Sequence, residues 1–70
     1  MTQLDTHLPG TRYIQGYIRD EKQVHLKLIT NDILTGKILW QDPECLCLMN
    51  SEQQQMLIWR TAIAYLVPQE

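Results

Sequence analysis

The spacing of the apolar residues changes once along the chain, from a helical period to a strand period. After Pro9-Gly10, four apolar residues recur at helical spacing and form one stripe: Tyr13, Ile14, Tyr17 and Ile18. This spacing predicts a helix that begins at Arg12, with Thr11 as its N-cap, and ends at Asp20-Glu21-Lys22. A helix of about three turns is too short to be stable alone, so its apolar stripe must pack on another element.

Beyond Lys22 the apolar period falls to two residues, which is typical of β-strands. The first predicted strand has two faces, one with Val24, Leu26 and Leu28 and the other with His25, Lys27 and Ile29. Asn31-Asp32 predicts a tight turn, and Gly36 predicts a sharp bend or bulge inside the second strand. The later strands are expected at Ile33 to about Asp42, Cys45–Asn50, Gln54–Arg60 and Ala62–Val67.

One short helix followed by five strands with short connections predicts a mainly β fold. The expected architecture is a small, strongly bent antiparallel sheet or an open barrel. A chain of 70 residues has room for one domain, so we expect a single domain over residues 1–70. The polar segment 1–7 is expected to be a mobile tail.

The charge balance narrows the class of function. Six Lys and Arg against eight Asp and Glu give a formal net charge of −2, which excludes a simple polybasic nucleic-acid binder. Five of the six basic residues lie in residues 1–40, so any nucleic-acid contact should favour surfaces built by the first half of the chain. No apolar run approaches the roughly 20 residues that cross a bilayer, and the N-terminus lacks a secretory signal pattern, so no membrane insertion is expected.

Cys45 and Cys47 lie two residues apart, which places both side chains on one face of a strand. This spacing disfavours a disulfide, and His7 and His25 supply no companion metal motif, so packed thiols are expected rather than a metal or redox site. A chain this small usually needs a further source of stability, and without disulfides or metal we expect it to come from oligomerisation. Free thiols also indicate a reducing cytoplasm.

No catalytic group of residues is visible in the sequence, and no cofactor is expected. His25 has no acidic partner nearby in sequence, which favours a solvated or packed histidine over a general base. Asp42 and Glu44 flank Pro43, where polar turn residues are expected, and a catalytic carboxylate pair is the weaker alternative. The chain is therefore not expected to be an enzyme.

The order of the predicted elements and several short motifs resemble the bacterial Sm-like family Hfq, from about Leu8 to Pro68. Val24–Leu28 is similar to the family's first strand, and Leu34–Ile38, with its glycine, is similar to the second. Gln41-Asp42 resembles the Phe-Asp step that closes the first Sm motif, and Ala62–Pro68 resembles the last strand. The resemblance implies an Sm-like fold assembled as a ring, most simply a homohexamer.

Two segments, Leu39–Asp42 and Ala62–Tyr65, are similar to the cyanobacterial branch of this family. In the ring, the fourth and fifth strands of neighbouring subunits should pair, because an isolated open sheet leaves both of its edges unpaired. The joints are expected to bury Met56, Ile58 or Tyr65. The resemblance also implies that Asp42 is structural and holds its loop through backbone hydrogen bonds.

For RNA, the resemblance implies two binding faces on the ring. The distal face, which binds adenine-rich RNA in the family, would use Lys27, Leu28, Thr30, Asn31, Asp32, Ile33, Thr35, Met56, Ala64 and Tyr65. The proximal face around the pore, which binds uridine, would use Gln41, Glu44, Trp59, Arg60 and Thr61. Ordinary turn and strand residues are the equal alternative for the distal set.

Departures from the family pattern point to weak RNA binding. Glu44 stands where the family has a base-stacking aromatic, and Thr61 stands where it has an imidazole. On the distal face Lys27 replaces a stacking tyrosine of the better-known branch, and Asp32 adds a negative charge. At the proximal pocket, Glu44 and Thr61 both weaken uridine binding. Adenine-rich RNA is therefore expected to bind better than uridine-rich RNA.

Three interpretations stay open at this point. Trp40 and Trp59 fit core or interface packing, and Trp59 also fits base stacking. Arg12, Arg19 and Lys22 form a weak basic stripe that is either a solvated helix face or a docking surface. The function is accordingly either an RNA-binding post-transcriptional regulator acting with small RNAs or a protein-interaction adaptor. For the adaptor, the resemblance implies docking on the type IV pilus extension ATPase, with consequences for motility.

Overall fold

The computed structural model describes residues 8–69, and the tail expected at residues 1–7 lies outside the described residues. A helix, α1 (Pro9–Arg19), precedes five strands: β1 (Gln23–Leu28), β2 (Ile33–Gln41), β3 (Cys45–Met49), β4 (Gln55–Trp59) and β5 (Ile63–Pro68). A single turn of 3-10 helix, η1 (Arg60–Ala62), joins β4 to β5. The predicted mainly β fold with one short N-terminal helix is confirmed, and η1 was not predicted.

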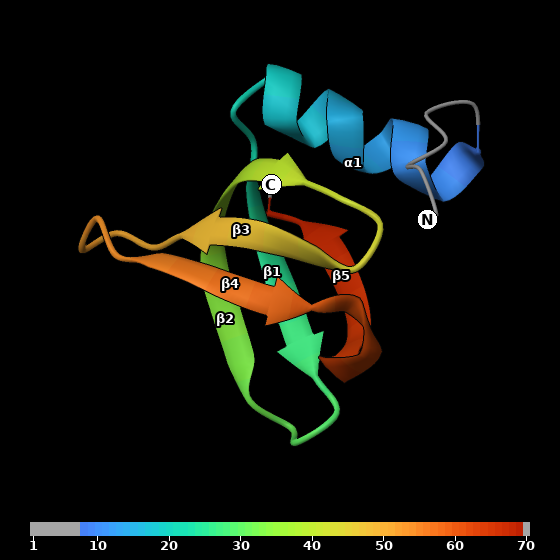
Figure 1. Cartoon of the computed structure of the whole chain (residues 1–70). Helices are drawn as coiled ribbons and strands as arrows, with labels where there is room; N and C mark the ends of the chain where they lie inside the picture. The colour runs from blue at the N-terminus through green and yellow to red at the C-terminus, as the bar shows by residue number, and fades with distance from the viewer. Residues whose placement is uncertain (1–7, 70) are drawn as a thin grey trace.

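The five strands form one antiparallel sheet in the order β4-β3-β2-β1-β5. The long strand β2 pairs along its first half with β1 and along its second half with β3, and Lys37 is opposite both Gln23 and Met49. This change of partner bends the sheet strongly, and α1 lies across one end of it (Figure 1). The first and last strands of the order, β4 and β5, are the two open edges.

The core lies inside this bent sheet and consists of alternate apolar side chains. Its buried members are Val24, Leu26, Ile38, Leu46, Leu48 and Ile58. Ile14, Tyr17 and Ile18 of α1 pack against them, which gives the short helix the tertiary support it needs. Ile58 is 6% exposed within one chain, so its expected burial at a joint between subunits is wrong.

The helix differs from the prediction at its beginning and on one face. It begins at Pro9, because proline suits the first turn of a helix, and Leu8 is its N-cap without a side-chain hydrogen bond. Thr11 is therefore inside the helix. Tyr13 is 69% exposed and does not belong to the buried stripe.

Gly36 lies where β2 changes partner and bends, which is one of its two predicted roles, and the predicted bulge is not at Gly36. The irregular register in β2 lies between Ile38 and Trp40. At Gly36, a Cβ atom would collide with the carbonyl group of Met49, 2.9 Å from its carbon, and lie 3.2 Å from the Cα of Asn50. The glycine lets the end of β3 pass close to the backbone of β2.

Both cysteines are free and buried, as the packed-thiol interpretation predicts. Cys45 and Cys47 are on the face of β3 opposite to Leu46 and Leu48, and in register with Trp59 and Leu57 of β4. Within residues 8–69, no group of three or more His, Cys, Asp and Glu side chains could hold a metal ion. The described helices are all too short or too polar to cross a membrane.

Candidate functional site

A chain of hydrogen bonds ties helix α1 to the connection between β4 and β5 through Arg60. The guanidinium Nε of Arg60 donates to the carbonyl of Asp42 at 2.9 Å, and Nη2 donates to the Gln41 side chain. The amide nitrogen of Gln41 in turn donates to Gln15 Oε1 at 2.8 Å and to the carbonyl of Thr11 at 3.2 Å. Arg60 thus acts as a structural link, and the N–H groups left over from these bonds are the ones it can offer to a ligand.

The proximal residues inferred from sequence are brought together around this link. The backbone N–H of Arg60 donates to the carbonyl of Glu44 at 2.9 Å, and Trp59 is opposite Cys45 in the β3–β4 register. Glu44 and Thr61 are exposed, so the cluster presents these two polar residues to solvent. A carboxylate at this position repels phosphate.

Asp42 holds the β2–β3 loop, as the resemblance implied. Its Oδ1 accepts hydrogen bonds from the backbone N–H groups of Glu44 at 2.9 Å and Cys45 at 2.8 Å. These two bonds lower the pKa of Asp42 below its ordinary value because they favour the charged carboxylate. Burial, with a smaller contribution from Asp42, raises the pKa of the Cys45 thiol, so this cysteine is held in its unreactive protonated form.

We predict an acid-sensitive contribution to stability from Asp42, revealed by Asp42→Asn. Because the pKa of Asp42 is lowered on folding, its charge stabilises the protein above the ordinary aspartate pKa of about 4, and this stabilisation is lost as the pH falls through the lowered value. The asparagine keeps an acceptor oxygen but no charge. Urea unfolding from pH 7 to pH 2 should show the difference between wild type and variant shrinking below about pH 4. A difference that stays constant over this range would contradict the prediction.

The two tryptophans lie at the surface of the single chain. Trp40 is 43% exposed and Trp59 is 53% exposed, so core packing is wrong for both, and interface packing or base stacking remains. Trp40 is in register with Cys47, which is in register with Leu57, so the three side chains form one row across β2, β3 and β4. This row continues to the open edge at β4.

The distal residues inferred from sequence gather mainly around the β1–β2 turn and β5. Lys27 is in register with Ile33 on one side and Tyr65 on the other, so the three share one face of the sheet. The ammonium of Lys27 lies 5.8 Å from the centre of the Tyr65 ring, within the range of a cation–π contact. Ile33 and Tyr65 are 60% and 49% exposed, and the aromatic face of Tyr65 is partly covered by the lysine.

The β1–β2 turn is held in one conformation by its polar residues. Asn31 has a positive φ of 77°, which asparagine adopts more readily than most residues. The Thr30 hydroxyl donates to Asp32 Oδ2 at 2.7 Å, and the N–H of Leu28 donates to the carbonyl of Asp32 at 2.8 Å. Thr35 lies one step further along the same face, where its hydroxyl is 2.9 Å from His25 Nδ1.

Met56 is separated from the rest of the distal set within one chain. It lies on β4 and packs partly against the core, whereas Lys27, Ala64 and Tyr65 lie on β1 and β5 at the other side of the sheet. Within one chain the distal set is therefore divided between two separate parts of the sheet.

The basic stripe on α1 is divided by the structure. Arg12 and Arg19 line a hollow on the helix together with Pro9, Tyr13 and Gly16, whereas Lys22 lies beyond the helix and outside this hollow. Arg19 Nε also donates to Asp20 Oδ1 at 3.1 Å, and this pairing lowers the pKa of Asp20.

The sequence interpretation missed Tyr13, Gly16 and Gln15 as candidate functional residues. Tyr13 was assigned to the apolar stripe because it lies four residues before Tyr17, although its position on the helix is at the edge of the buried stripe. Gly16 is on the face opposite the core, which a helical projection of Pro9–Arg19 would have revealed. Gln15 has no sequence signal, because its bond to Gln41 spans 26 positions.

Comparisons with known proteins agree on one family. The model of the family described as "Hfq related" matches residues 8–68. An Hfq protein from Anabaena sp., known from its crystal structure, is 45% identical, with a TM-score of 0.81 over 89% of this chain and 98% of that chain. The structure of a pleiotropic translational regulator, Hfq, has a TM-score of 0.79 over 83% of this chain and 95% of that chain, and at 17% identity it supports the fold alone. No curated protein matches the chain.

Proposed function

The chain belongs to the Hfq-related family, and from this premise we propose that it is a ring-forming, non-enzymatic RNA-binding protein that regulates messages after transcription. The observation that carries the proposal is the exposed face shared by Ile33, Lys27 and Tyr65, which joins apolar, cationic and aromatic side chains in one row. Aromatic rings stack on bases and cations attract phosphates, so this row has the chemistry for single-stranded RNA.

The ring that we propose is a homohexamer of single-domain subunits in the cytoplasm. Exposed apolar side chains on both open edges support pairing between subunits: Leu57 and Trp59 on β4, and Tyr65 and Val67 on β5. An edge strand with apolar side chains makes an isolated chain prone to aggregation, because its backbone N–H and C=O groups are unpaired. These groups pair when a ring closes. The two free cysteines fit a reducing compartment.

We propose that RNA affinity is weak and favours adenine-rich strands. Six copies at −2 each give a ring of about −12, which opposes phosphate approach. At the distal face, Lys27 lies over the Tyr65 ring and competes with a base for stacking on it. At the proximal face, part of the Arg60 guanidinium is already engaged and Glu44 supplies a carboxylate instead of a ring.

Lys27→Tyr should strengthen adenine-rich binding, because it removes the cation covering Tyr65 and adds a second stacking ring. Fluorescence anisotropy with labelled oligo-adenine at physiological salt should show a gain of about tenfold, since one stacked base contributes roughly 1–3 kcal/mol. In wild type, binding should be weak, salt-sensitive and weaker still for oligo-uridine.

Two matched variants control this experiment. Lys37→Tyr makes the same change on β2, outside the Ile33–Lys27–Tyr65 row, and should leave oligo-adenine binding little changed. Glu44→Tyr should raise oligo-uridine affinity, because it supplies the missing aromatic at the proximal cluster. Tight binding of oligo-uridine by the wild-type protein at physiological salt would overturn the proposed preference.

A second candidate function is a protein-interaction adaptor, such as one that docks on the type IV pilus extension ATPase and affects motility. The observation that favours it is the exposed basic hollow on α1, which faces away from the core and would recur in every subunit of a ring. Repetition of a weak contact produces avidity for a partner that is itself multivalent. The docking surface would then be the helix face and not the distal row.

A further inference from the structure

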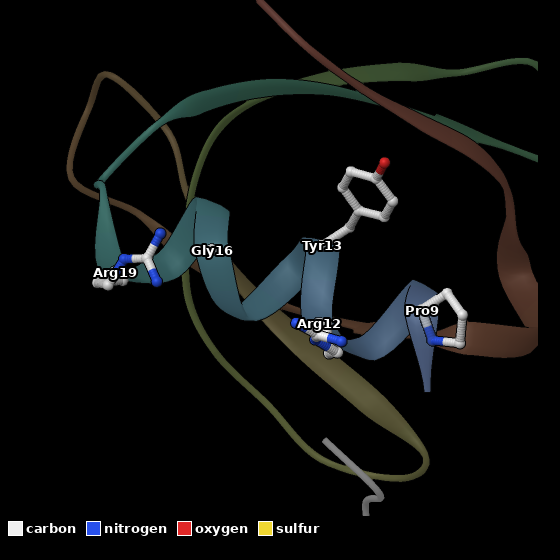
Figure 2. A pocket seen from close by; sticks show the side chains of 5 residues that line it. All are labelled: Pro9, Arg12, Tyr13, Gly16 and Arg19. Atoms are coloured by element: carbon white, nitrogen blue, oxygen red, sulfur yellow. The ribbon is translucent and has the colours of Figure 1, made fainter. Parts of the chain in front are cut away.

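The outward side of α1 carries a hollow of about 460 Å³ lined by Pro9, Arg12, Tyr13, Gly16 and Arg19. Figure 2 shows Arg12 and Arg19 on the side of the helix that faces the viewer, with Gly16 between them, and Tyr13 directed toward the flank of the sheet. Ile14, Tyr17 and Ile18 occupy the opposite side of α1 and pack on the core. The hollow is therefore built from side chains that the core does not use.

Gly16 forms the centre of this hollow without a packing reason for being glycine. A Cβ atom there would have one heavy atom within 4 Å, Arg19 Nη2 at 3.8 Å, which is ordinary contact. A glycine in a helix interior is less stable than alanine, so the position carries a cost that the fold does not require. The result of the glycine is an open strip of backbone between two arginines.

The two arginines are spaced for two separate negative charges. Arg12 and Arg19 lie seven residues apart, which is two helical turns or about 10.5 Å along the axis. Arg19 is oriented by its bonds to Asp20, with Nε at 3.1 Å from Oδ1 and Nη2 at 3.4 Å from Oδ2. Its side chain stays 77% exposed, so it remains accessible to a ligand.

An apolar hollow adjoins the basic one on the other side of Tyr13. It has a volume of about 330 Å³ and is lined by Gly10, Tyr13, Ile14, Tyr17 and Leu66. The rings of Tyr13 and Tyr17 are 6.5 Å apart at an angle of 40°, and together they form its aromatic side. Tyr13 thus separates a cationic surface from an apolar one.

We propose that this α1 surface binds an extended acidic segment of a partner protein, with two acidic residues three positions apart and proline or another apolar residue between them. In a polyproline II segment, side chains three positions apart share a face and are about 9.3 Å apart, which matches the spacing of the two arginines. Aromatic-lined grooves are a known way of recognising such segments. The intervening apolar residues would contact Gly16 and Tyr13.

The neighbourhood of Arg19 favours this peptide over an RNA strand. Asp20 is 59% exposed beside Arg19, and Glu21 follows it on the surface. A continuous phosphate backbone would bring several negative charges past these carboxylates, whereas the proposed segment brings one acidic residue to Arg19 and uncharged residues next to it. The proposal deepens the adaptor function proposed above, on which it rests, and it is independent of RNA binding at the distal row.

The test uses the assembled full chain and a labelled peptide that contains Glu-Pro-Pro-Glu, with Gln-Pro-Pro-Gln as the matched neutral peptide. The acidic peptide should bind and the neutral peptide should bind at least several-fold more weakly. Arg12→Gln combined with Arg19→Gln should reduce binding by about tenfold, the effect of losing two exposed ion pairs. Lys37→Gln removes one positive charge elsewhere and should leave binding unchanged.

Gly16 supplies a variant that separates binding from folding. Gly16→Leu fills the hollow, so it should raise the melting temperature of the protein and still reduce peptide binding by a similar factor. Gly16→Ala adds a single methyl group that clears Arg19 and should retain most of the binding.

Four outcomes would overturn the proposal. One is equal binding of the acidic and neutral peptides, and another is unchanged binding in the double arginine variant. In the third, oligo-adenine displaces the peptide, and the double arginine variant loses affinity for oligo-adenine as well as for the peptide. This result would assign the surface to RNA. The fourth is capture of the pilus ATPase that persists in the double arginine variant, which would reject this surface but not the adaptor function. Sedimentation of the same samples reports separately on the ring.

Discussion

Gly36→Ala should destabilise the protein by about 3 kcal/mol, which is a large fraction of the stability of a domain of this size. The new methyl group would collide with the carbonyl of Met49 and press on the Cα of Asn50. These contacts are backbone atoms at the end of β3, so no side chain can rotate away to relieve them. Urea unfolding followed by circular dichroism measures the change.

The same substitution at Gly16 is the matched control for Gly36→Ala. At Gly16 the added methyl group has open space apart from Arg19 Nη2 at 3.8 Å, and alanine is the better helix former. Gly16→Ala should therefore stabilise the protein by up to about 1 kcal/mol. If both variants lost stability equally, the close approach of β3 to Gly36 could not be the cause.

Leu57→Glu should dissociate the ring into folded subunits of 8.3 kDa at micromolar concentration. Leu57 lies on the open edge strand β4 and is 54% exposed, so it contributes little to the core of its own chain. Burying a leucine stabilises a contact by roughly 1.5–3 kcal/mol, and a carboxylate at a closed joint adds the cost of an unpaired charge. Each joint of the ring repeats this loss.

Sedimentation velocity distinguishes dissociation from unfolding when it is combined with circular dichroism. Ser51→Glu is the matched control, because it adds the same charge in the exposed turn between β3 and β4. This control should sediment as the intact ring. A Leu57→Glu protein that also sediments as a ring would show that the β4 edge is not the joint.

The type and order of the elements followed from local patterns, but their boundaries did not. The alternation around Val24 and Leu26 predicted β1, and both residues are fully buried in the structure. The helix began three residues earlier than expected, because Pro9 supports a first turn and Leu8 serves as N-cap without a side-chain bond. Arg60 and Ala62 were assigned to the ends of two strands, although a 3-10 turn over Arg60–Ala62 directs Arg60 back to Gln41.

The candidate site followed from sequence mainly where a family motif existed. The role of Asp42 in its loop was implied by the resemblance, and its two backbone hydrogen bonds confirm it. The contact between Lys27 and Tyr65 had no such signal, because it joins residues 38 positions apart through the β1–β5 register. Tyr65 is visible in the sequence, but only the β1–β5 register reveals that Lys27 lies over its ring.

What the sequence alone determined is the set of apolar faces and the balance of charge. Periodicity and net charge depend on residue identity and spacing, which are local properties. What only the tertiary structure decided is which residues become neighbours: the link from Arg60 through Gln41 to α1, the edges β4 and β5, and the open hollow at Gly16. These features depend on the bend of β2 and on the direction in which α1 crosses the sheet. Both are set by packing between distant segments, which no local pattern encodes.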